Sequence, residues 1–127
     1  MPERIYMDSL QLAKKIAGIL DDKKAIDINV IRIEEISSLA DYFVIASGTS
    51  NTHVKSLADE IEMKIKQETG SMPIGVEGYR TNSWILIDYV SVVVHVFTGE
   101  GRDFYDLDRL WRDGEKIEID LKPTSSI

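Results

Sequence analysis

Residues 84–111 read WILIDYVSVVVHVFTGEGRDFYDLDRLW and contain both tryptophans and the densest run of β-branched side chains in the chain. Two strands that fold back on each other around residues 90 and 91 would place Trp84 opposite Phe97. Val90 and Ser91 lack the Gly or Asn that a tight hairpin turn prefers, which leaves a longer loop and shifted pairing open as an alternative. We predict an antiparallel ribbon as the organising element of the fold.

Side chains alternate along a strand, so this ribbon has two unlike faces. One face is aliphatic and needs a hydrophobic core to cover it; it carries Ile85, Ile87, Tyr89, Val92, Val94 and Val96. The other, which we call the mixed face, carries Trp84, Leu86, Asp88, Val93, His95 and Phe97. Large aromatic side chains beside an acid and an imidazole suit a partner surface better than a sealed core.

Length and composition predict one globular domain. The chain has 127 residues, of which 43% are hydrophobic, and this is too short for two ordinary domains. It contains no cysteine, so disulfides and thiolate metal sites are excluded and a reducing, cytoplasmic setting is expected. The amino end lacks an apolar signal segment, and no apolar run is long enough to cross a membrane, so we expect neither secretion nor a membrane span.

The charge balance bears on the kind of partner. There are 22 acidic and 15 basic side chains, and the formal net charge is -7. Such a charge repels a phosphate backbone unless the basic residues cluster, and they are spread along the sequence. Direct nucleic-acid binding is therefore disfavoured, and a basic protein is the better electrostatic match.

Hydrophobic spacing predicts the elements that precede the ribbon. Apolar residues three and four apart indicate a first helix that Ser9 caps and that ends near residues 21–24. Alternation indicates a half-buried strand at about 26–33, and the continuous apolar run at 42–46 indicates a central strand. The clearest helix follows, with Thr49 or Ser50 as its N-cap and Gly70 as its C-cap.

Weaker signals lie on either side of the ribbon. Pro73 argues that residues 72–77 form a connector or a short edge strand. Residues 105–111 have the spacing of a short helix, and a polar tail is expected from residue 114 onward. The whole order predicts a single α/β (α+β) domain, with a mixed parallel and antiparallel sheet flanked by helices.

Enzymatic alternatives rest on weak patterns. Gly48-Thr49-Ser50 lies between a strand and a helix, where phosphates often bind, but Ser and Thr cap most helices in any case. Metal-dependent nucleotidyl transfer would need paired acids, and Asp106 and Asp108 point apart if they lie on a helix.

The two histidines have no serine or carboxylate at a spacing that indicates catalysis. His53, in the first turn of a helix, suits a surface or capping role. His95 is either a hydrogen-bonded ring in a half-buried layer or a partner contact.

Four motifs in order, GTSNTHVKSLADEI, GVEG, WILIDYVSVVVHVF and RDFYDLDRLW, resemble the ribosomal silencing factor family, RsfS, also called Iojap-related. The resemblance covers about residues 10–111. It implies a non-enzymatic translational repressor, without cofactor or metal, whose sheet is distantly related to nucleotidyltransferases. It also implies a homodimer that binds the large ribosomal subunit through ribosomal protein uL14 and blocks joining of the small subunit when nutrients are limiting.

The resemblance also bears on single residues. The family usually has Gly-Asp where this chain has Val90-Ser91, and residues beyond 113 have no firm counterpart, so we divide the chain into a silencing-factor domain at 1–113 and a tail at 114–127. We expect the following partner-binding residues, of which Tyr89 lies on the aliphatic face and the others on the mixed face or at matching motif positions: Trp84, Leu86, Asp88, Tyr89, His95, Phe97, Tyr105, Leu107 and Trp111. A third reading is a dimeric scaffold that uses the apolar patch for self-association alone.

Overall fold

A computed structural model describes residues 8–78, 83–99, 102 and 114–119. Its elements, in chain order, are α1 (Ser9–Asp22), β1 (Ile26–Arg32), β2 (Tyr42–Gly48), α2 (Asn51–Thr69), β3 (Gly75–Glu77), β4 (Trp84–Asp88), β5 (Val92–Thr98) and β6 (Glu115–Ile117). The expected helix at 105–111 lies outside the described residues.

The strands form one mixed sheet in the order β3-β4-β5-β2-β1-β6. β2 and β5 are parallel neighbours at its centre, and all other neighbours are antiparallel. The predicted single α+β domain with a mixed sheet is confirmed. Neither described helix combines the length and apolar character that crossing a membrane requires.

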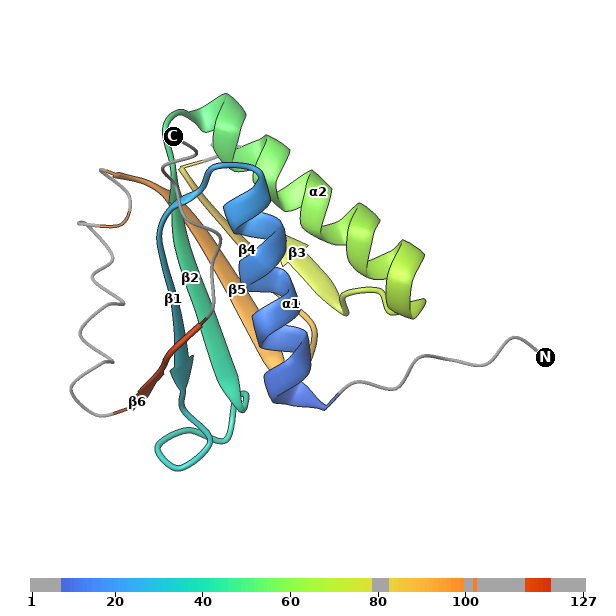
Figure 1. Ribbon diagram of the computed structural model, residues 1–127, viewed down its shortest axis with the longest axis vertical. Coiled ribbons are helices and arrows are strands. Elements are labelled where there is room, and N and C mark those ends of the chain that lie inside the picture. The colour runs from blue at the N-terminus through green and yellow to red at the C-terminus, as the bar shows by residue number, and fades with distance from the viewer. Residues whose placement is uncertain (1–7, 79–82, 100–101, 103–113, 120–127) are drawn as a thin grey trace.

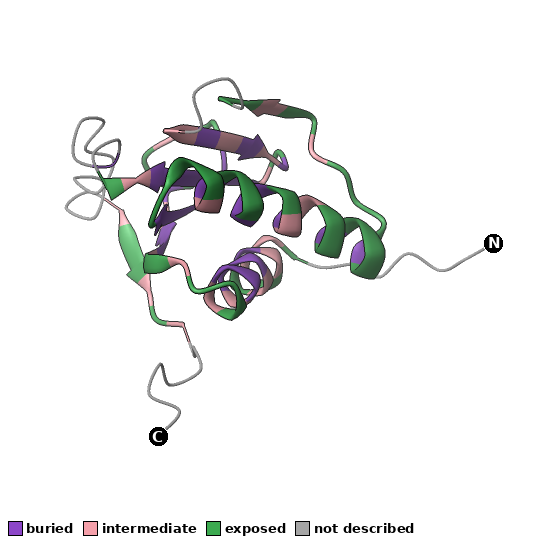
Figure 2. Ribbon diagram, turned by 90° about the horizontal axis from the view of Figure 1, so that it is seen from above, coloured by how far each residue is buried: buried purple, intermediate pink, exposed green. Residues whose placement is uncertain are grey.

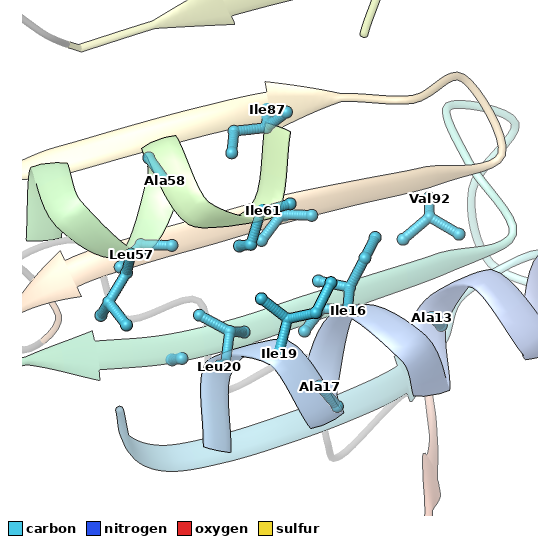
Figure 3. Close-up of a cluster of buried hydrophobic side chains, with 14 of the residues drawn as sticks. Ala13, Ile16, Ala17, Ile19, Leu20, Leu57, Ala58, Ile61, Ile87 and Val92 are labelled. Carbon is cyan, nitrogen blue, oxygen red and sulfur yellow. The ribbon is translucent and has the colours of Figure 1, made fainter. Parts of the chain in front are cut away.

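Both described helices cover the same face of the sheet (Figures 1 and 2). Each helix turns one apolar stripe inward, because residues three and four apart share a helix face. In α1 the stripe includes Ala13, Ile16, Ala17 and Leu20, and in α2 it includes Val54, Leu57, Ala58, Ile61 and Ile65. These stripes meet the aliphatic face of the ribbon, as Figure 3 shows around Ile87 and Val92. Each fully buried aliphatic side chain contributes about 1.5–3 kcal/mol.

The helix ends follow the expected capping chemistry, with one correction. In α2 the Ser50 hydroxyl accepts a hydrogen bond from the His53 N–H at 3.0 Å, and Gly70 ends the helix at a φ of 76°. In α1, however, the N-cap is Asp8 and not Ser9. The Asp8 carboxylate accepts from the Gln11 N–H at 2.8 Å while the Gln11 side chain accepts from the Asp8 N–H, so the two form a reciprocal capping box.

The ribbon has the predicted pairing, with Trp84 opposite Phe97 and Asp88 opposite Val93. The turn is tight although it contains no glycine, because Val90 adopts a φ of 74° and the Ser91 N–H donates to the Tyr89 carbonyl at 2.9 Å. The longer loop that the missing Gly or Asn suggested does not form.

Two expectations at the sheet edges have different outcomes. β3 is a short edge strand, as Pro73 indicated. At the opposite edge the segment expected to begin a polar tail forms β6, which pairs with β1 through Val30, Ile31 and Arg32. Ile117 packs against the helix-covered core, so the ordered sheet extends beyond residue 113.

Candidate functional site

The mixed face lies on the side of the sheet opposite α1 and α2. Its residues pack with a second buried cluster that contains Ile31, Ile33, Ala40, Ile45, Val93 and Phe97, with Phe43, Trp84 and Leu86 packed against it. The alternation of side chains along β4 and β5 explains the division, since the aliphatic residues of the same strands join the helix-covered core.

Exposure differs sharply within the mixed face. Phe97, His95 and Val93 on β5 are only 0%, 4% and 7% exposed. Trp84, Leu86 and Asp88 on β4 are half-buried. β3 pairs only with Leu86, Ile87 and Asp88, so its ladder ends before Trp84. Within the described part of the chain, the half-buried residues of the mixed face therefore lie on β4.

Four rings form a cluster on this face. Trp84 stacks on Phe97 with 5.5 Å between ring centroids, and the His95 ring lies 5.9 Å from Trp84 and 4.6 Å from Phe43. The Trp84 Nε1–H donates to His95 Nδ1 at 3.2 Å. Aromatic pairs of this kind contribute about 0.5–1.5 kcal/mol beyond the area they bury, so the cluster supports Trp84 from below.

His95 is neutral at physiological pH. Burial lowers the pKa of its imidazole from the ordinary 6.5 to about 4. Its Nε2 atom is buried and has no hydrogen-bond partner among the described residues. The ring is thus buried and hydrogen-bonded to Trp84, as in the first of the two interpretations that the sequence left open. The second, a contact with a partner, stays a prediction.

Asp88 has a structural role that the sequence analysis missed. Its Oδ1 accepts a hydrogen bond from the Val90 N–H at 2.7 Å, which stabilises the turn between β4 and β5. An Asp two residues before a turn residue is the sequence signal for this contact. Asp88 is still half-buried on the mixed face, so the same carboxylate is available to a basic partner.

Glu77 is a second acid that the sequence analysis did not place on this face. It is exposed and lies on β3 directly opposite Leu86, and facing residues of an antiparallel pair point to the same side. The mixed face therefore has carboxylates at two positions next to half-buried apolar side chains. Only the pairing of β3 with β4 reveals this.

Tyr89 does not belong to the mixed face, although it was expected among the partner-binding residues. It is 7% exposed and packs in the helix-covered core on the opposite side of the sheet. Burial, with a smaller effect of Glu62, raises the pKa of its hydroxyl. The other expected contacts at Tyr105, Leu107 and Trp111 lie outside the described residues.

Arg102 is buried beside the sheet and was not singled out by the sequence analysis. Its guanidinium donates to the Asp27 carbonyl at 2.7 Å and to the Ser47 hydroxyl at 2.9 Å. Asp27 lies in a bulge of β1, at a φ of 51°, and its carbonyl also accepts from the Asn29 side chain. These contacts attach the chain that follows β5 to the start of β1.

His53 and Ser50, which were considered for enzymatic chemistry, have structural roles, while Asp106 and Asp108 lie outside the described residues. His53 Nδ1 accepts from the Thr49 N–H, and its Nε2 lies 2.9 Å from the Lys23 carbonyl, so the ring connects the start of α2 to the end of α1. This is the capping role that the sequence suggested. The hydroxyl of Ser50 caps α2. Among the described residues no group of three or more His, Cys, Asp or Glu side chains is arranged to hold a metal ion.

Comparison with known proteins agrees with the motif resemblance. The family model described as "Ribosomal silencing factor during starvation" matches residues 6–126. The chain belongs to the ribosomal silencing factor family. The match continues past the boundary drawn at residue 113, in agreement with the pairing of β6 in the sheet.

Relatives of the silencing factor family resemble the chain over most of its length. The ribosomal silencing factor of Bacillus subtilis is 38% identical over 115 residues, which are 91% of this chain and 97% of that protein. A crystal structure of a Chromobacterium violaceum protein superposes with a TM-score of 0.79 at 33% identity, covering 95% of this chain and 94% of that one. A mouse protein named "Mitochondrial assembly of ribosomal large subunit protein 1" is 33% identical over 98 residues, which are 43% of its length. Family membership supports a ribosome-associated role in silencing translation.

Proposed function

We propose that this protein binds the large ribosomal subunit through ribosomal protein uL14 and prevents the small subunit from joining, especially under nutrient limitation. The observation that carries the proposal is the mixed face of a chain from the silencing factor family. There, half-buried Trp84 and Leu86 lie beside the carboxylates of Asp88 and Glu77. Buried aromatic anchors next to charged groups are the usual composition of a binding hot spot.

Charge supports a basic protein as the partner. The net charge of -7 favours association with a basic ribosomal protein and opposes direct binding to RNA phosphates. The acids of the mixed face would pair with Arg or Lys of that partner in charge-assisted hydrogen bonds. The name of the mouse relative refers to the large ribosomal subunit and so points to the same particle.

The mechanism is steric exclusion. A domain of 127 residues has a radius of gyration of about 14 Å, so once bound at the subunit interface it occupies space that the small subunit needs. No reaction, nucleotide or metal takes part. The proposal requires the protein to share a compartment with ribosomes, which we expect to be the cytoplasm.

Co-sedimentation tests the proposal directly. Purified protein is centrifuged with separated small subunits, separated large subunits and joined ribosomes at physiological salt. We expect it to sediment with large subunits only and to reduce subunit joining as its concentration rises. Failure to sediment with either subunit would refute the proposal.

Two substitutions test the proposed surface. Trp84→Ala and Asp88→Asn should each weaken large-subunit binding by about 2 kcal/mol, the typical effect at an interface hot spot. Asp88→Asn retains an Oδ1 acceptor for the Val90 N–H and removes only the charge, so the turn should stay intact. Asp59→Asn on α2 is the matched control, because it makes the same charge change on the helix-covered side and should leave binding unchanged.

The homodimer implied by the resemblance is part of the same proposal. If self-association uses the mixed face, subunit binding and dimerisation compete. Light scattering of the wild type and the Asp88→Asn variant, with and without large subunits, would separate a shared face from separate ones.

A further inference from the structure

We propose that His95 is a positioning residue that holds the Trp84 indole in the orientation presented to a basic protein partner, an inference that rests on the proposed function. The two side chains come from adjacent antiparallel strands, and His95 pairs with Leu86, two residues from Trp84. The Trp84 Nε1–H donates to His95 Nδ1 at 3.2 Å, and the two rings are nearly parallel, 19° apart. The imidazole therefore restrains the indole through both a hydrogen bond and ring stacking.

The hydrogen bond also determines where the proton of His95 lies. Because Nδ1 accepts, the neutral ring carries its proton on Nε2. That nitrogen is buried and has no partner, which costs stability. A phenylalanine would fill the same layer without this cost, so fold stability alone does not account for an imidazole at position 95. Among the described residues, the polar contact that the ring makes is with Trp84.

The aromatic neighbours of His95 keep its Nδ1 atom available as a hydrogen-bond acceptor. Phe43 lies 4.6 Å from the His95 ring centroid and Phe97 lies 6.2 Å from it, so the imidazole is held between aromatic neighbours and is only 4% exposed. Burial lowers the pKa of His95 to about 4, which leaves the Nδ1 lone pair free to accept at neutral pH.

A fixed indole binds more tightly than a mobile one because less rotamer freedom is lost on association. Trp84 is the aromatic of the ring cluster that combines partial exposure with a position on the accessible strand β4. His95 and Phe97 are buried beneath it and serve as its support. From the entropy of immobilising one such side chain, we expect loss of the hydrogen bond to weaken binding about fivefold.

A double-mutant cycle on large-subunit binding tests this assignment. The full-length variants are His95→Phe, which keeps an aromatic ring but removes the acceptor, Trp84→Phe, which removes the donor, and the combination of both. We expect His95→Phe to weaken binding about fivefold in the wild-type background and to have no further effect once Trp84 is Phe. Equal effects in the two backgrounds would overturn the assignment, because His95 would then act independently of Trp84.

A spectroscopic measurement and a rescue variant complete the test. In ¹⁵N-labelled protein we expect a scalar coupling between Trp84 Nε1 and His95 Nδ1, and a His95 proton on Nε2. His95→Asn, whose Oδ1 atom occupies nearly the place of Nδ1, should restore binding lost in His95→Phe. A His95 proton on Nδ1, or no coupling, refutes the positioning role even if a variant fails to fold. If the wild type does not bind large subunits, both proposals fall; if it binds and the cycle is additive, only this one falls.

Discussion

Val90 shows how one residue can hold a conformation that its side chain disfavours. Its φ of 74° lies in the left-handed region, which a β-branched residue rarely adopts. Three hydrogen bonds hold the turn in place: Val90 N–H to Asp88 Oδ1, Ser91 N–H to the Tyr89 carbonyl, and Tyr89 N–H to the Val92 carbonyl. The surrounding contacts therefore compensate for local strain.

We predict that Val90→Gly stabilises the protein by about 1 kcal/mol, since glycine adopts this φ without steric cost. The side chain is 57% exposed, so little buried area is lost. The midpoint of urea unfolding measures the change. Ser91→Gly is the control, because Ser91 is not among the described residues with positive φ and should gain nothing. A lower midpoint for Val90→Gly would contradict the strain argument.

His95 should make stability depend on pH in a defined window. Its pKa of about 4 in the folded protein is below the ordinary 6.5 of an unfolded chain, so the unfolded state binds the proton more tightly. The contribution is fully present above about pH 6.5 and is lost as the pH falls to about 4, by roughly 3 kcal/mol in total.

Urea unfolding from pH 7 to pH 4 would measure the contribution of His95 to the free energy of unfolding. The comparison is with His95→Gln, which has no titrating group at this position. The carboxylates titrate in both proteins, so the difference between the two curves isolates His95. We expect the free energy of unfolding of the wild type to fall more steeply with decreasing pH than that of the variant. The difference in slope should correspond to the uptake of up to about one proton on unfolding in this window. Parallel curves would mean that His95 titrates alike in the folded and unfolded chain.

At the scale of elements, the join between β3 and β4 depends on one glycine. Gly78 has a φ of 96°, and a Cβ at this position would lie 1.8 Å from the Trp84 carbonyl oxygen. The two strands can approach there only without a side chain. The GVEG motif thus has a physical reason for its last residue, which also lies next to the main accessible aromatic of the mixed face.

We predict that Gly78→Ala destabilises the protein by about 3 kcal/mol, because it combines backbone strain with a clash against main-chain atoms. Gly75→Ala, in the same motif, is the matched control: no heavy atom lies within 4 Å of its added Cβ, and the change should stay within about 0.5 kcal/mol. Thermal unfolding of the two variants beside the wild type would test the contrast. Similar losses in both would contradict it.

Elements with strong local signals could be predicted from the sequence. The apolar stripe and the caps of α2 lie within one segment, as does the alternation of β4 and β5, so their existence and pairing follow from nearby residues. β6 could not be predicted this way. Its three residues are polar or half-buried, and they form a strand because β1 offers them an open edge.

At the scale of the whole molecule, the two faces of the sheet have different surroundings. One face is closed by α1 and α2 (Figure 2) and supplies most of the core. The other carries the ring cluster and the acids. The net charge of -7 gives the molecule an overall attraction to basic partners, and the half-buried residues of β4 supply the proposed short-range contacts.

The sequence by itself determined the α+β class, the two faces of the ribbon, most element boundaries and the family. These properties depend on the spacing of apolar residues within a segment, because that spacing determines which side of a helix or strand is apolar. Only the tertiary structure decided that His95 and Phe97 are buried and that Glu77 joins the mixed face. Burial depends on which strand lies alongside, and the pairing that brings β2 beside β5 joins residues far apart in the chain, such as Ile45 and His95.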